Sequence, residues 1–166
     1  MRLFAIEERT STRQGAAMNR KRLLGVAVGL VAALLAGGYY FGMVLPAQRH
    51  DQELNRLDRW FYRANEHPPA RIEPAVWNTV CINALHNSVR NCLGLHRGVT
   101  TAQVRRLADY LDATQGRDLQ SLEGAYGLME YIESMTPSAA GYFGPMQYQV
   151  ELDTGLKPKP NPIRVP

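Results

Sequence analysis

The chain has 166 residues, of which 45% are hydrophobic and 20% charged, so it is long enough for one ordinary domain and an appended segment. Its formal net charge of +4 comes largely from a basic segment before an apolar run and from the closing stretch KPKPNPIRVP. Charge placed this way excludes a basic nucleic-acid-binding face as the main interpretation, and we expect no nucleic-acid partner.

An uncharged apolar run from Leu23 to Leu45 is the first long element of the sequence. A helix rises about 1.5 Å per residue, so this run can cross a hydrocarbon core about 30 Å thick. Aromatic residues near its end suit a membrane interface. The sequence therefore predicts a transmembrane helix over 23–45, with the lipid bilayer as a partner.

Basic residues flank this run unequally. A cluster of three directly precedes it: Arg20, Lys21 and Arg22. By the positive-inside rule, residues 1–22 stay in the cytoplasm as a disordered basic segment, and the chain after Pro46 is exported. The run then acts as the signal anchor of a single-pass protein of the cell envelope, with its C-terminal domain in the periplasm if the source is bacterial.

Two alternatives concern the N-terminal part. The residues from Met18 also fit the basic start of a secretory signal peptide, and small residues at 36–38 offer a cleavage site that would release a secreted domain. The apolar run continues well past these positions, and this length favours an uncleaved anchor. Met18 is also a second candidate for the translation start, because the residues before it show no periodic apolar face.

Small residues repeat at every fourth position of the predicted transmembrane helix: Gly25, Gly29, Ala33 and Gly37. Such a stripe permits close approach of two helix backbones, so it predicts a homodimer or docking on another membrane protein. Membrane helices are generally rich in Gly and Ala, and an ordinary lipid-facing helix is the alternative interpretation.

Helical periodicity dominates residues 46–137. Four segments carry it, each bounded by Pro, Gly or a capping signal: 46–69, 73–94, 100–116 and 117–137. Thr100 and Gln103 have the spacing of a capping box. We expect a mostly α fold, in which a small exported domain of three to four helices follows the transmembrane helix.

The last segment, 138–166, is rich in Gly and Pro. Alternating prolines at Pro158, Pro160 and Pro162 predict an extended tail of the polyproline type, outside the core. The stretch from Tyr148 to Leu152 alternates as a short strand would, but no partner strand is apparent.

Two cysteines, Cys81 and Cys92, lie on one predicted helix. At about 100° per residue both fall on its apolar stripe, whereas His86 points nearly opposite, to solvent. Their Cα atoms would be about 16 Å apart, and a disulfide tolerates about 7 Å. The alternative is a break near His86 that lets the chain form the disulfide common in exported proteins. The continuous helix is only slightly favoured.

The other chemical groups form no recognisable site. Only Cys92 and His96 have the spacing of a zinc-ligand pair, and His96 suits a helix end. Asp109 with Asp112 is typical of a solvated helix face, and so is Glu130 with Glu133. His50 beside Asp51 is a single adjacent pair and defines no site. We predict no catalytic residue, no metal ligand and no cofactor.

These observations favour a membrane-anchored protein that acts by binding, as an accessory, assembly or inhibitor-type subunit. The alternative is a membrane-anchored enzyme that uses Cys81, Cys92 and the histidines for thiol redox or hydrolytic chemistry. Two inert, buried thiols favour the binding protein, whereas one reactive cysteine with a low pKa favours the enzyme.

Overall fold

The computed structural model describes residues 24–136 and 143–165. Every regular element within these residues is a helix, which confirms the mostly α fold class. The chain divides after Leu45 into two units. The basic residues predicted to set the membrane topology lie outside the described residues: Arg20, Lys21 and Arg22.

The first unit contains the predicted transmembrane segment. From Leu24 onward its residues belong to a helix that runs to Glu66, the one helix of the described chain long and apolar enough to cross a membrane. The apolar side chains of the run are exposed, with Leu24 at 69% and Leu34 at 74% accessibility. A π-helical stretch, η1 (Tyr40–Val44), lies within the aromatic part of the run. The segment is therefore a candidate membrane span.

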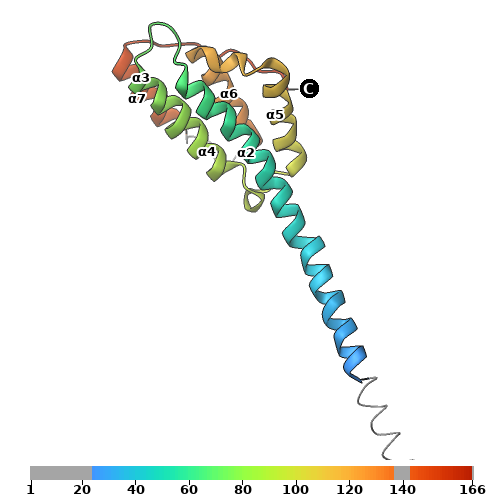
Figure 1. The fold of residues 1–166 in the computed structure, drawn as a ribbon. Coiled ribbons are helices and arrows are strands. Elements are labelled where there is room, and N and C mark those ends of the chain that lie inside the picture. Colours follow the sequence, from blue (N-terminus) through green and yellow to red (C-terminus); the bar gives the residue numbers. More distant parts are fainter. Residues whose placement is uncertain (1–23, 137–142, 166) are drawn as a thin grey trace, which may run out of the picture. The chain divides into compact units, whose positions relative to one another are not determined.

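The second unit is a helical domain (Figure 1). Its elements, in chain order, are α2 (Leu45–Glu66), α3 (Pro74–Asn78), the π-helix η2 (Thr79–His86), α4 (Asn87–Cys92), the 3-10 turn η3 (Leu95–Arg97), α5 (Thr101–Thr114), the 3-10 turn η4 (Arg117–Gln120), α6 (Leu122–Met135) and α7 (Gly144–Thr154). The four predicted segments of helical periodicity all contain helices.

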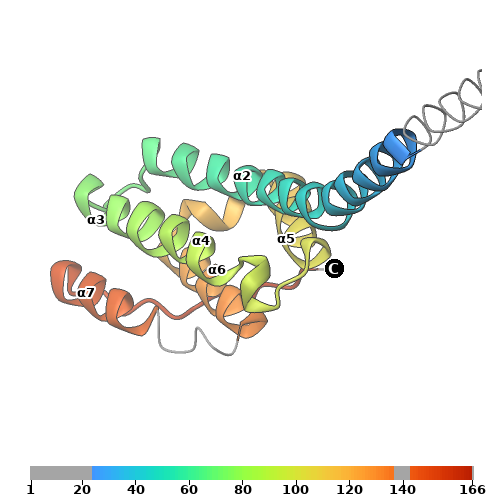
Figure 2. The same ribbon diagram turned by 90° about the horizontal axis from the view of Figure 1, so that it is seen from below.

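Helix α2 packs against two neighbouring helices of this unit. The continuous helix formed by α3, η2 and α4 lies on one side of α2, and α5 lies on the other (Figures 1 and 2). Helix α6 contacts η2, η4 and α4, and α7 contacts α3 and η2. Large side chains such as Phe61, Trp77 and Tyr126 fill the space between them with at most 2% exposure.

Local signals set the helix ends as the sequence predicted. Thr100 caps α5: its hydroxyl accepts from the Gln103 backbone N–H, and the Gln103 side chain accepts from the Thr100 backbone N–H. Gln115 and Gly116 then adopt left-handed conformations that end the helix. A Cβ atom at Gly116 would lie 2.6 Å from the Trp60 ring, so glycine lets α2 approach this turn.

The helix from Pro74 to Cys92 is continuous, but it is not a regular α-helix. Its buried residues come in pairs that recur every four positions: Val76 and Trp77, Val80 and Cys81, Ala84 and Leu85, Ser88 and Val89, Cys92 and Leu93. In an α-helix such a pattern would drift by about 40° per repeat. The wider turns of η2 hold more residues each and keep the pairs facing the core.

The predicted extended tail requires a correction. Residues Gly144–Thr154 form α7 instead, which also rules out a strand from Tyr148 to Leu152. Val150 of α7 is buried, and Ile163 and Val165 of the extended residues that follow pack against the core. The alternating pattern produces a helix with two apolar faces, so one face can pack inward while the other stays exposed.

Candidate functional site

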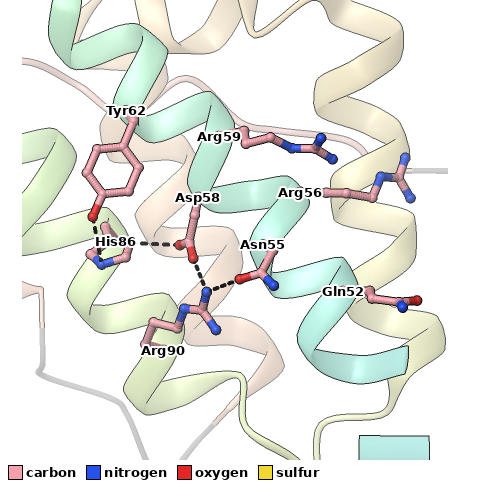
Figure 3. Close-up of a pocket in the computed structure, with 8 residues that line it drawn as sticks. All are labelled: Gln52, Asn55, Arg56, Asp58, Arg59, Tyr62, His86 and Arg90. Atoms are coloured by element: carbon pink, nitrogen blue, oxygen red, sulfur yellow. Dashed lines mark hydrogen bonds and ion pairs between the residues drawn. The ribbon is translucent and has the colours of Figure 1, made fainter. Parts of the chain in front are cut away.

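A shallow polar groove lies between α2 and α4 (Figure 3). It has a volume of about 660 Å³ and is open to solvent along its length. Its lining side chains come from two helices: Gln52, Asn55, Arg56, Asp58, Arg59 and Tyr62 from α2, His86 from the end of η2, and Arg90 from α4. This groove is the candidate functional site.

Asp58 is the buried centre of the groove, with a side chain only 8% exposed. One carboxylate oxygen accepts a 2.7 Å hydrogen bond from His86 Nδ1, and the other accepts from Arg90 Nη2. Arg90 Nη2 also donates to the Asn55 side-chain oxygen. Both oxygens of Asp58 are thus satisfied, as a buried carboxylate requires.

His86 is oriented by this carboxylate. Because a carboxylate only accepts, Nδ1 carries a proton, and Nε2 lies 3.4 Å from the Tyr62 hydroxyl. The Tyr62 and His86 ring centroids are 5.0 Å apart. The prediction that His86 points to solvent is therefore wrong: its side chain is 19% exposed and holds α4 against α2.

The four-residue repeat of the helix from Pro74 to Cys92 explains why His86 faces α2. Asn78, His86 and Arg90 are separated by multiples of four residues and all bond to α2 from one side of their helix. Asn78 donates to the Asn65 side chain at 3.2 Å, and the contacts of His86 and Arg90 with α2 follow in antiparallel order. A phase of 100° per residue places His86 on the wrong side because it ignores the wider π turns.

Arg56 forms a second polar cluster on the opposite flank of α2. Its guanidinium donates to Glu53 at 2.6 Å, to Asp109 at 2.7 Å and to Asp112. Arg105 donates to Glu53 at 2.8 Å, which closes the network. Asp109 and Asp112 are exposed, as predicted for a solvated helix face, and both also bind an arginine of α2.

The charges of this cluster shift the pKa values of its acids. Burial raises the pKa of Glu53, but hydrogen bonds from Arg105 and Arg56 outweigh burial and hold that pKa below its ordinary value. Burial likewise opposes ionisation of Asp112, whose pKa is lowered by Arg56 and by the Trp60 indole N–H that donates at 2.7 Å. Both carboxyls are therefore held in the ionised form.

The two cysteines lie in the core, away from the groove. Cys81 is 0% and Cys92 is 4% exposed, and no disulfide joins them, which agrees with the prediction of a continuous helix. Burial raises the pKa of the Cys81 thiol to about 12, and burial also raises the pKa of the Cys92 thiol. Both thiols are therefore protonated at neutral pH and poorly nucleophilic.

Two of the other histidines, His50 and His96, do not line the groove. His50 is 2% exposed, and its Nε2 donates to the Leu93 carbonyl at 2.6 Å while its Nδ1 accepts from Thr101 at 3.2 Å. His96 lies in η3, at a helix end as predicted. Within the described residues no group of three or more His, Cys, Asp and Glu side chains could hold a metal ion.

Sequence reasoning missed the residues that build the groove. Sequence patterns offered no reason to single out Asp58, Tyr62 and Arg90, because no motif connects positions on separate helices. The signal that could have found two of them is the recurrence of residue pairs at every fourth position from Val76 to Leu93. This spacing places His86 and Arg90 on one side of their helix. The stripe of Gly25, Gly29, Ala33 and Gly37 belongs to the first unit and has no part in the groove.

A scan against protein-family models, a search of curated proteins and a search of solved structures each found no match to this chain.

Proposed function

We propose that this chain is a single-pass, membrane-anchored protein of the cell envelope. Its N-terminus is cytoplasmic, and its helical domain is extracytoplasmic and acts by binding, as an accessory, assembly or inhibitor-type subunit. The candidate span of the first unit supports the anchor, and the basic cluster before it supports the orientation.

The observation that carries the binding role is the groove beside α2. Its buried carboxylate is saturated by two partners, so it is a fixed structural group and not a free acid or base. The groove is shallow and open, which suits contact with a macromolecule more than enclosure and turnover of a small substrate. Exposed Arg and Tyr side chains line it, and these residue types are enriched at protein interfaces.

The buried thiols weigh against the enzyme alternative. Thiol chemistry needs a thiolate that a substrate can reach, and burial both shields Cys81 and raises its pKa to about 12. The imidazole of His86 is bound to Asp58 and Tyr62 instead of a thiol. We therefore expect neither cysteine to react with a maleimide until the domain unfolds.

The first unit supplies a second contact. The small-residue stripe of the candidate span has open space around Gly25, Gly29 and Gly37, with no heavy atom within 4 Å of an added Cβ atom. Close packing of a second helix there would use this space. The partner is a second copy of this chain or another membrane protein.

The test is photo-cross-linking of the full-length chain, with the reactive amino acid placed at Tyr62 and, as a control, at the exposed Arg106 of α5. We expect Tyr62 to link to one defined protein, which is recovered in mild detergent and not obtained from position 106. Failure to link any partner from Tyr62 would contradict the binding role. Recovery of a soluble chain that begins near Tyr39 would contradict the anchor.

A further inference from the structure

The hydrogen-bonding groups of the groove are unbalanced. Among the described residues that line it, Asp58 is the single carboxylate, and both of its oxygens are already occupied by His86 and Arg90. Three of the lining residues are arginines: Arg56, Arg59 and Arg90. The carboxylate oxygens of the groove therefore bond to residues of the same domain, whereas some of its arginine N–H donors remain able to bond to a ligand.

The three arginines are not equivalent. Arg56 is turned to the α5 side, where three carboxylates of Glu53, Asp109 and Asp112 neutralise it. Arg90 makes both of its bonds through Nη2, so Nε and Nη1 are not used within the described residues. Arg59 is exposed and makes no hydrogen bond or ion pair there, although its charge also acts on Asp112 (Figure 3). Arg59 is thus the groove arginine whose hydrogen-bond donors are least used by the protein itself.

An aromatic surface lies beside these donors. The Tyr62 side chain is 49% exposed, and its ring leans on the His86 ring at a tilt of 53°. Because Asp58 fixes His86, the tyrosine has a rigid neighbour on one face and solvent on the other. Such a ring offers apolar contact area at a low cost in conformational entropy.

We propose that this groove binds an acidic segment of a partner protein. A carboxylate of the segment pairs with Arg59, a neighbouring carboxylate reaches the unused edge of Arg90, and an apolar side chain covers Tyr62. The pairing of guanidinium and carboxylate is geometrically specific as well as favourable in charge. This inference rests on the proposed binding function and names the chemistry of its partner.

A peptide fits this groove better than a polymer of phosphates does. A phosphate chain would satisfy Arg59 and Arg90 but would leave the exposed ring of Tyr62 without an apolar partner. An acidic segment with interspersed apolar residues matches both kinds of group, and mixed contacts of this type are typical of protein interfaces.

Fluorescence anisotropy of the full-length chain in non-ionic detergent tests this inference. The probe is a fluorescein-labelled peptide of alternating Glu and Leu, compared with its Gln and Leu counterpart and with a polyphosphate of equal charge as competitor. The variants are Arg59→Gln and, as a matched control, Arg106→Gln on α5. Arg59 makes no hydrogen bond or ion pair within the residues that the structure describes, so its variant should unfold at the wild-type temperature.

We expect the Glu peptide to bind at least tenfold more tightly than the Gln peptide, and Arg59→Gln to weaken it about tenfold, as loss of one charge-assisted contact predicts. Arg106→Gln should leave the affinity unchanged. Equal affinity of both peptides, unchanged affinity in Arg59→Gln, or stronger binding of polyphosphate would overturn the proposal. If Tyr62 still cross-links to a partner in that case, the binding function stands and the acidic partner is wrong.

Discussion

The two flanks of α2 use similar residues in different ways. On the α5 flank, Arg56 is surrounded by carboxylates, and Trp60 donates its indole N–H to one of them, Asp112. On the α4 flank the arrangement is reversed: the carboxylate of Asp58 is the central group and accepts hydrogen bonds from His86 and Arg90. The first flank has an excess of acceptors and the second has an excess of donors.

This difference separates a structural contact from a candidate binding surface. A cation that meets three carboxylates has no charge left for a ligand, so the α5 flank serves to hold two helices together. A buried carboxylate that is saturated by two partners also anchors α4, and it leaves part of Arg90 unused at the surface, in a groove that the exposed Arg59 also lines. Binding capacity therefore lies on the flank where the buried charge is negative.

Of the substitutions on the two flanks of α2, removal of Asp58 should cause the largest loss of stability. Asp58→Ala leaves His86 and Arg90 without their shared partner at a site that is 8% exposed. We expect a loss of about 2 to 3 kcal/mol in the free energy of unfolding, below the full cost of breaking a buried pair because Arg90 is partly exposed. Thermal unfolding of the full-length chain in detergent measures it.

The matched control for this variant is Asp51→Ala. Asp51 is an exposed acid of the same helix, and its removal should change the unfolding free energy by less than about 0.5 kcal/mol. Equal losses in the two variants would show that Asp58 does not anchor α4.

Removal of Arg56 should have a smaller effect. Its side chain is 26% exposed, and two of its carboxylate partners are 58% and 47% exposed, so solvent screens these pairs. We expect Arg56→Gln to cost about 1 kcal/mol, against no measurable change for the exposed control Arg49→Gln. A loss as large as that of Asp58→Ala would mean that the α5 flank is the stronger anchor.

Arg56→Gln should also change how the stability of the domain depends on pH in the acidic range. Glu53 and Asp112 have folded-state pKa values below their ordinary values of 4.5 and 3.8. The stability that these two carboxylates provide is therefore fully present above their ordinary pKa values. It is lost as the pH falls through their lowered folded-state pKa values. In Arg56→Gln these pKa values rise toward normal, so the loss of stability between about pH 5 and pH 2 should be shallower than in the wild type. Unfolding temperatures across this range, with Arg49→Gln as control, measure the difference.

Most of the helical fold could be predicted because its signals are local. The capping box at Thr100 and the left-handed turn at Gly116 act within a few residues of the helix ends they set. Helix α7 was missed because its apolar residues alternate, which is a strand pattern on its own. Its helical form depends on tertiary contacts, such as the burial of Val150, that periodicity does not contain.

The groove could not be predicted because it depends on helical phase and on pairing between helices. An error of a fraction of a turn moves His86 from the α2 side to solvent, and only the structure reveals the π turns that correct it. Asp58 and His86 are 28 positions apart in the sequence, and no local rule pairs them. The cysteines were placed correctly because the same apolar stripe holds for either helical period.

Removal of the Tyr62 hydroxyl should have the smallest effect on stability. Any change in binding by this variant can therefore be assigned to the α4 flank itself and not to unfolding. The hydroxyl is 3.4 Å from His86 Nε2 in an exposed setting, so Tyr62→Phe should cost less than about 0.5 kcal/mol in thermal unfolding. It keeps the ring, so binding of the Glu and Leu peptide should also stay within about twofold of the wild type, whereas Tyr62→Ala removes the apolar surface and should weaken binding several-fold. If Tyr62→Phe weakens binding as much as Tyr62→Ala does, the hydroxyl is the group that the ligand contacts. The ring would then not serve as the apolar surface of the groove, and the α4 flank would bind through polar groups alone.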